Sequence, residues 1–125
     1  MLGDKRSSAI LAVSDLERAK QFYGETLGLE LAGEPMGVLV YRTGDTELVV
    51  YPSATSGTNR ANAAVWACGD ELDDIVADLR SKGVEFEHYE IEGLTYDEGV
   101  HRAGDFGAVW LKDPDGNILH LNSSE

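Results

Sequence analysis

The sequence predicts an α+β fold in which two tandem βαβββ modules form an open, barrel-like cleft with their helices on the outside. The main observation is an internal repeat: the interval from Asp15 to Asp70 equals the interval from Gly28 to Gly83. Both pairs occupy the same places in a strand–helix–strand order, which indicates a tandem duplication. The length of 125 residues suits a single domain, 1–125, built from two half-size modules.

Module one is predicted over residues 7–52. Its first strand is the apolar run 9–13. Ser14 and Glu17 then form a capping-box pattern that predicts a helix start, and Gly28 supplies a left-handed helix end. Three further strands are predicted from alternating apolar residues, over 29–31, 38–41 and 48–51.

Module two is predicted over residues 62–124 and repeats the same order of elements. A linker over 53–61, rich in Ser, Thr, Gly and Asn, precedes it. The helix begins near Asp70 and ends at Gly83. The later strands are predicted over 84–89, 108–111 and 118–121, with a turn over 114–117 between the last two.

One face of each predicted sheet is left without a helix. We expect the duplicate module to cover it, so that the two sheets curve around a central cleft lined from both halves. A concave cleft of this kind is the natural place for a ligand. The loop 92–107 contains several glycines and is expected to be a mobile lid over the cleft.

The composition describes an ordinary globular chain with a strong negative charge. It is 42% hydrophobic and 26% charged, and its net charge of −13 disfavours nucleic acid and anionic membranes as partners. No apolar run approaches the roughly 20 residues of a membrane span. The first residues lack the apolar core of a signal peptide, and the single cysteine, Cys68, fits a reducing compartment. We therefore expect a cytoplasmic protein.

Several common catalytic motifs are absent from the sequence. There is no phosphate loop, no dinucleotide-binding glycine fingerprint, no paired CxxC zinc motif and no GxSxG nucleophile elbow. Their absence disfavours nucleotide-dependent and serine-hydrolase chemistry.

Aromatic side chains at the expected cleft-lining positions are the candidate ligand-binding residues. Flat rings with polar edges suit a planar or cationic guest, and the alternative for each ring is ordinary core packing. The predicted set is Tyr41, Tyr51, Trp66 and Trp110, together with His101 in the predicted loop.

Glu47 and His120 are the candidate catalytic residues. His120 lies in an otherwise apolar last strand, and Glu47 follows a turn, so that the strand register decides which way it faces. If both face the cleft, they form a general base and its orienter for metal-free proton transfer. The alternatives are a half-buried, hydrogen-bonded His120 and a Glu47 that faces solvent.

Two segments resemble a known family. The run VSDLERA over 13–19, with Phe22–Tyr23 and LGL over 27–29, resembles the opening module of the vicinal oxygen chelate superfamily. The run KDPDGN over 112–117 is similarly typical of its second module. This superfamily contains glyoxalases, bleomycin-resistance proteins, fosfomycin-resistance enzymes and extradiol dioxygenases. The resemblance extends over about residues 8–122 and implies the two-module fold, but the matching residues are helix caps and turns, which do not specify a function.

The resemblance also implies where a divalent metal ion would bind. In metal-dependent members, the first and last strands of each module supply the ligands; the corresponding positions here are Ser8, Ala64, Glu47 and His120. Only Glu47 and His120 suit a metal, and a catalytic ion typically needs a third protein ligand, such as His101 or a partner chain.

The resemblance therefore implies a small-molecule-binding protein of the bleomycin-resistance type, without a complete metal site. The expected guest is aromatic or cationic, and no cofactor is expected. The alternative is a metal-dependent lyase, isomerase or dioxygenase that uses Glu47, His120 and a third ligand. Family members of this length usually pair, so a homodimer is expected.

Overall fold

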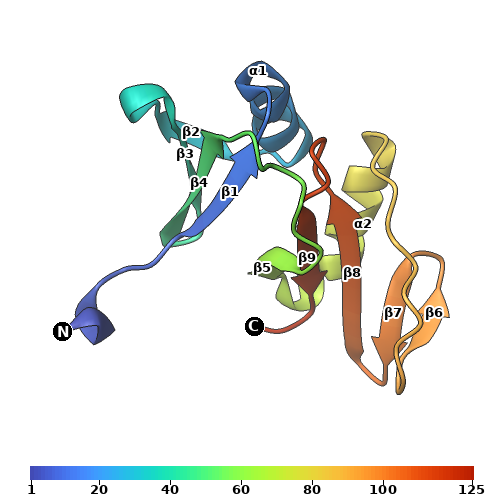
Figure 1. The fold of residues 1–125 in the computed structure, drawn as a ribbon. Helices are drawn as coiled ribbons and strands as arrows, with labels where there is room; N and C mark the ends of the chain where they lie inside the picture. The colour runs from blue at the N-terminus through green and yellow to red at the C-terminus, as the bar shows by residue number, and fades with distance from the viewer. The chain divides into compact units, whose positions relative to one another are not determined.

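The computed structural model describes residues 1–125 and divides into two compact units. Unit 1 comprises Met1–Asn59 and Pro114–Asn117, and unit 2 comprises Arg60–Asp113 and Ile118–Glu125. Each unit contains one open sheet and one principal helix, as Figure 1 shows, and the predicted α+β class is confirmed. The turn Pro114–Asn117, which the sequence assigns to module two, belongs to unit 1.

Unit 1 contains a four-stranded sheet in the order β1-β4-β3-β2, with β1 parallel to β4. Its strands are β1 (Ala9–Val13), β2 (Glu30–Gly33), β3 (Leu39–Thr43) and β4 (Thr46–Pro52). Its helical segments are η1 (Leu2–Asp4), α1 (Leu16–Lys20), the π-helical η2 (Gln21–Thr26) and η3 (Pro35–Gly37).

The sheet of unit 1 has a buried face and an open face, because successive side chains of a strand point to opposite sides. The buried face packs against α1 and η2 and contributes Leu11, Val13, Leu39, Tyr41, Leu48 and Val50 to the core. The open face of unit 1 carries Ile10, Ala12, Val40, Arg42, Glu47, Val49 and Tyr51.

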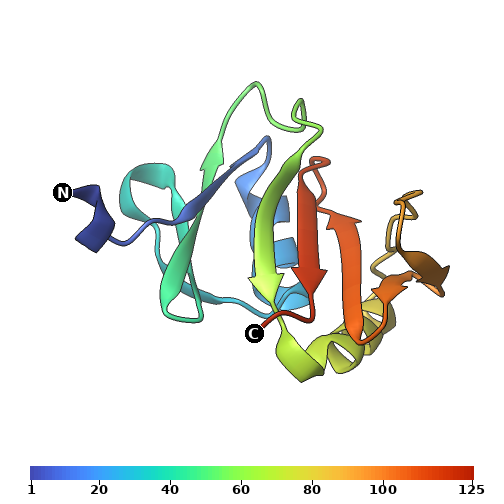
Figure 2. The same ribbon diagram turned by 90° about the horizontal axis from the view of Figure 1, so that it is seen from below.

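Unit 2 contains a five-stranded sheet in the order β5-β9-β8-β7-β6, with β5 parallel to β9. Figure 2 shows the red β9 between the yellow-green β5 and the orange β8. The strands are β5 (Asn62–Ala67), β6 (Thr95–Asp97), β7 (Val100–Ala103), β8 (Phe106–Lys112) and β9 (Ile118–Asn122). The helical segments are η4 (Gly69–Glu71) and α2 (Leu72–Ser81).

The sheet of unit 2 buries one face against α2. The position of Gly107 shows which face this is, since a Cβ there would lie 2.9 Å from the Leu72 side chain of α2. The core on this face consists of Leu72, Val76, Leu79, Val100, Val109, Leu111, Leu119 and Leu121. The opposite face, called the open face of unit 2 below, carries Trp110 and His120 as a facing pair. No helix of the structure combines the length and the apolar character needed to cross a bilayer.

Two predictions about residues 84–107 are wrong. The segment 84–89 forms no full strand: its backbone pairs with the sheet through one bridge, between Phe86 and Leu111, where the Glu87 N–H donates to the Trp110 oxygen at 2.8 Å. The segment 92–107 is not a loop but contains the β6–β7 hairpin, whose two turn residues are Glu98 and Gly99, and its movement as a lid stays a prediction. Both have a positive φ, 48° and 92°, which the tight two-residue turns of hairpins require. The glycine therefore marks a turn.

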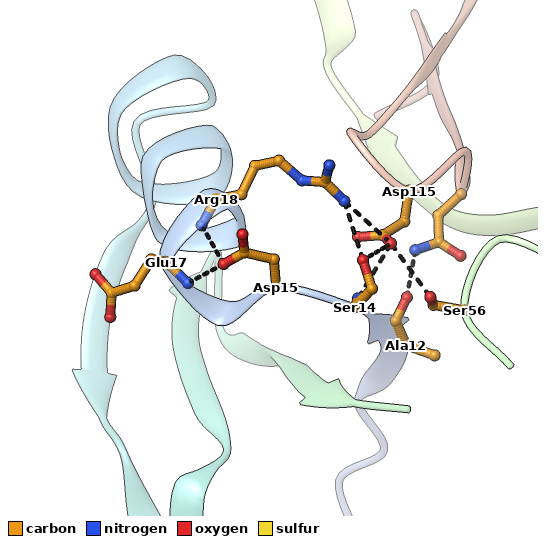
Figure 3. A network of polar contacts seen from close by, with 8 residues as sticks. Ala12, Ser14, Asp15, Glu17, Arg18, Ser56 and Asp115 are labelled. Carbon is orange, nitrogen blue, oxygen red and sulfur yellow. Dashed lines mark hydrogen bonds and ion pairs between the residues drawn. The ribbon is translucent and has the colours of Figure 1, made fainter. Parts of the chain in front are cut away.

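The start of α1 is predicted correctly, but its capping residue is Asp15. The Asp15 carboxylate accepts hydrogen bonds from the backbone N–H groups of Glu17 and Arg18, at 3.0 and 3.1 Å (Figure 3). Ser14, the predicted cap, is engaged elsewhere: its hydroxyl donates to the carboxylate of Asp115 at 2.6 Å. The capping-box prediction therefore misses by one residue.

Asp115 joins the turn Pro114–Asn117 to the rest of unit 1. Its Oδ1 accepts from the Ser14 backbone N–H at 3.1 Å and from the Ser56 hydroxyl at 3.2 Å, and Arg18 lies 3.3 Å away (Figure 3). Burial by itself raises the pKa of Asp115, but the hydrogen bonds from Ser14 and Ser56 and the charge of Arg18 outweigh it and lower the net pKa. The Asn117 amide donates to the backbone oxygen of Ala12 at 2.8 Å. The turn is thus part of the core architecture of unit 1.

Candidate ligand-binding face

Three of the predicted site residues lie together on the open face of unit 2. Trp110 on β8 is the register partner of His120 on β9. His101 on β7 pairs with Ala108 of β8, whose side chain points to the same side as that of Trp110. The sheet therefore brings side chains from three adjacent strands to one surface.

Five rings follow one another across this face, and we call them the ring chain: His88, Tyr96, His101, Trp110 and His120. His88 stacks on Tyr96 with ring centroids 3.7 Å apart, and Trp110 stacks on His120 at 4.5 Å. His101 stands between the two stacks, edge-to-face with Tyr96 at 5.2 Å and with Trp110 at 4.9 Å. The ring chain contains all three histidines of the sequence.

His120 is held in one orientation by main-chain and side-chain partners. Its Nδ1 lies 3.1 Å from the backbone oxygen of Val109, which can only accept, so that this nitrogen carries the proton. Its Nε2 then accepts from the amide of Asn122 at 3.1 Å. The Asn122 amide is itself fixed, because its Oδ1 accepts from the backbone N–H of Ser124 at 3.0 Å.

The environment of His120 favours the neutral imidazole. Burial lowers the pKa of His120, and the hydrogen bond to the Val109 carbonyl offsets only part of this effect. A neutral ring that is oriented at both nitrogens can stack on a ligand or serve as a base if Asn122 moves away.

His101 is buried, and one of its nitrogens has no partner. The residue is 1% exposed and lies in β7. Its Nε2 lies 3.0 Å from the backbone nitrogen and 3.1 Å from the backbone oxygen of Tyr89. Its Nδ1 has no hydrogen-bond partner. The expectation that His101 lies in a loop is therefore wrong, although it does lie on the open face of the sheet.

Tyr41 and Trp66 do not lie where the sequence places them. Tyr41 is 1% exposed on the buried face of unit 1, where its ring lies 6.1 Å from that of Tyr23, and burial raises the pKa of its hydroxyl. Trp66 is the register partner of Leu121, on the α2 side of its sheet. In β5 it is Val65, the register partner of His120, whose side chain shares the open face of unit 2.

Tyr51 and Glu47 both lie on the open face of unit 1. Tyr51 pairs with Ala12 of β1, and Glu47 pairs with Arg42 of β3. Arg42 forms an ion pair with Glu30 at 2.9 Å, so that the face carries charge around Glu47. Since Glu47 belongs to unit 1 and His120 to unit 2, their action as a pair stays a prediction.

Sequence reasoning did not select His88, Tyr89, Tyr96 or Asn122. Tyr89 touches both His101 and Trp110, with centroid separations of 6.3 and 5.4 Å. The two-residue turn Glu98–Gly99 was the available signal for Tyr96, because a tight hairpin centred there places Tyr96 opposite His101.

One protein-family model matches most of the chain. The family model "Glyoxalase/Bleomycin resistance protein/Dioxygenase superfamily" matches residues 6–121. The chain belongs to this superfamily.

Relatives of this superfamily member cover most of its length. It is 29% identical over 119 residues to the uncharacterized protein YetH of Bacillus subtilis (strain 168), covering 87% of this chain and 89% of YetH. The crystal structure of a glyoxalase/bleomycin resistance protein from Streptomyces sp. CB03234 is 26% identical, with a TM-score of 0.62 and coverage of 93% and 99%. Lactoylglutathione lyase from Agrobacterium tumefaciens is 18% identical, with a TM-score of 0.66 and coverage of 95% and 92%, and shares the fold.

The residues present do not fit the metal centre that the superfamily implies. Within neither unit do three His, Cys, Asp or Glu side chains gather in an arrangement that could hold an ion. Ser8 and Ala64 supply no suitable ligand atom, and the Nε2 of His120 is occupied by the Asn122 amide. His101, the proposed third ligand, has its Nε2 against the main chain of Tyr89 and its Nδ1 buried.

Proposed function

We propose that this superfamily member binds a small, planar organic molecule on the open face of unit 2 and does so without a metal ion. The ring chain is the observation that carries the proposal: five rings from adjacent segments pack in series along one side of the sheet, with its Tyr96 end exposed. Aromatic pairs contribute about 0.5–1.5 kcal/mol each beyond the burial of their area, so a few such contacts support specific binding.

The charge of the chain narrows the class of guest. The net charge is −13, and acids lie beside the ring chain: Glu90 is 3.5 Å from His88, and Glu87 pairs with Lys112 at 3.2 Å. A negative field repels anions and attracts cations. The proposed guest is therefore an uncharged or cationic aromatic molecule.

Three planar probes test the proposal: indane, 1-indanone and N-methylquinolinium. We expect at least one of them to bind the natural protein, and Trp110→Leu to weaken this binding about tenfold, because it removes the largest ring of the ring chain. Trp66→Leu is the matched control, since Trp66 lies on the α2 side of the same sheet. Calorimetry measures the affinity of each probe for the natural protein and for the two variants. The proposal fails if no probe binds, or if the two variants lose affinity equally.

A metal-dependent lyase, isomerase or dioxygenase is the second candidate. One observation favours it: His120 donates its Nδ1 proton to a backbone carbonyl, which is how metal-binding histidines are commonly oriented. The engaged Nε2 weighs against it. The two candidates differ in whether activity or binding depends on a divalent ion.

We also propose that the protein is a cytoplasmic homodimer. The strands β2 and β6 are edge strands of their sheets, and such edges favour pairing with another chain. Light scattering at micromolar concentration is expected to give twice the chain mass of 13.5 kDa, and a mass of one chain would contradict the proposal.

A further inference from the structure

We infer that His101 is the polar anchor of the ring chain and that its Nδ1 donates a hydrogen bond to a carbonyl oxygen of the ligand. The inference rests on the proposed function and deepens it by naming the ligand chemistry: an uncharged aromatic ketone, lactam or quinone. It starts from the one polar atom in this part of the molecule that nothing in the protein satisfies.

The Nδ1 of His101 is the only buried side-chain nitrogen or oxygen atom in residues 1–125 without a hydrogen-bond partner. Burying such a group without a partner costs free energy, so native proteins rarely keep one without a use for it. His120 differs from His101, because both of its ring nitrogens have hydrogen-bond partners.

The contacts of the other nitrogen indicate which tautomer His101 adopts. The backbone N–H of Tyr89 points at Nε2 from 3.0 Å, the shorter of the two contacts that this nitrogen makes. Buried backbone N–H groups are left unpaired more rarely than carbonyl oxygens. We therefore assign Nε2 as the acceptor for Tyr89, which leaves the proton on Nδ1 and makes Nδ1 an unused donor.

Among the rings around His101, Tyr96 is the one that a ligand can displace most easily. Among the rings that touch His101, Tyr96 is 42% exposed, and the side chain of its stacking partner His88 is 49% exposed. Tyr89 and Trp110 are half-buried. Tyr96 also lies in the three-residue strand β6 at the edge of the sheet. Exposed side chains change rotamer within nanoseconds, so a planar guest can take the place of the Tyr96 ring against His101.

The acceptor is a neutral carbonyl oxygen because the surroundings are acidic. Glu90 lies beside His88, and the cation Lys112 is already paired with Glu87. A carboxylate on the ligand would be repelled by this negative charge. The neutral oxygen of a ketone or lactam accepts the hydrogen bond without such repulsion.

The matched probes indane and 1-indanone test the inference, since they differ only by the carbonyl group. We expect the natural protein to bind 1-indanone about fivefold more tightly than indane, the effect of one net hydrogen bond. His101→Phe keeps a ring but removes the donor, and should reduce the difference to less than about twofold. Trp66→Leu should retain the difference.

Nuclear magnetic resonance of the natural protein gives a second readout that does not depend on a variant folding. The Nδ1 proton of His101 should move downfield when 1-indanone binds and should stay in place with indane. Equal affinities for the two probes, or an unchanged Nδ1 signal with 1-indanone bound, would overturn the inference while leaving ring-chain binding intact. If neither probe nor N-methylquinolinium binds, the proposed function fails and the inference fails with it.

Discussion

At the level of single residues, the proposed ligand binding depends on the hydrogen bonds of two histidines. His120 and His101 both lie on the open face of unit 2, but they are engaged differently. His120 has partners for both nitrogens and is fixed as a neutral ring, whereas His101 has one nitrogen without a partner. The first is suited to stacking, and the second to a directed hydrogen bond.

We predict that His120 titrates at a lower pH than an ordinary histidine. Burial lowers its pKa, so an NMR titration should give a value below the ordinary 6.5. Asn122→Asp should raise the pKa, because a carboxylate would replace the amide that contacts Nε2 and would favour the charged ring. A measured value at or above 6.5 in the natural protein would contradict the assignment.

The lowered pKa of His120 also makes the free energy of unfolding depend on pH. With the folded-state pKa below 6.5, the unfolded chain binds the proton more readily than the folded chain. The contribution of His120 to the free energy of unfolding is therefore complete above pH 6.5 and declines as the pH falls from 6.5 through the folded-state pKa. Replacing His120 with glutamine should remove this part of the pH dependence in urea unfolding.

At the scale of secondary-structure elements, the turn Pro114–Asn117 holds unit 1 together through Asp115. We expect Asp115→Ala to lower the free energy of unfolding by about 2 kcal/mol, since it removes charge-assisted hydrogen bonds from Ser14 and Ser56. Asp4→Ala is the control, because the Asp4 side chain is 75% exposed and contacts only its neighbour Lys5. Urea denaturation compares the variants, and equal losses would show that the network contributes little.

The pKa of Asp115 predicts when this contribution is lost. It is lowered from 3.8, because the hydrogen bonds and Arg18 outweigh the effect of burial. The stabilisation is present above the unfolded-state value of 3.8 and disappears as the pH falls through the lower folded-state pKa.

The elements also show what the sequence could predict. The strand–helix–strand order and the two open sheets follow from repeats, caps and alternation, which are local signals. The β6–β7 hairpin was missed because its glycines were interpreted as a sign of mobility, although Glu98–Gly99 is a turn pair. Trp66 was placed on the wrong face because the face that each β5 residue occupies is set by pairing with the distant strand β9, which alternation alone does not specify.

The candidate site was predictable only in part for the same reason. His120 and Trp110 could be found from their positions in predicted strands. The burial of His101, its contact with Tyr89 and the stack of His88 on Tyr96 depend on which strand neighbours which, and no local pattern specifies that. The sequence therefore indicated which sheet face carries the site, but it did not indicate the contacts that the side chains make there.

At the scale of the whole molecule, the superfamily supplies a fold that serves both metal-dependent enzymes and binding proteins, so that the side chains must decide between them. Here the side chains favour binding: a series of rings lies on one sheet face, and the Nε2 atoms of His120 and His101 are already engaged by other groups. We therefore propose that this member holds its ligand through rings and a histidine donor, without a divalent ion.

Titration of Ni²⁺, Zn²⁺, Mn²⁺ and Fe²⁺ into metal-stripped protein tests this claim most directly, with calorimetry and the His120 imidazole signals as readouts. The account predicts no stoichiometric binding at micromolar metal and an unchanged affinity for the planar probes. Binding of one ion per chain at micromolar concentration, with a shift of the His120 signals, would contradict it and would favour a metal-dependent enzyme.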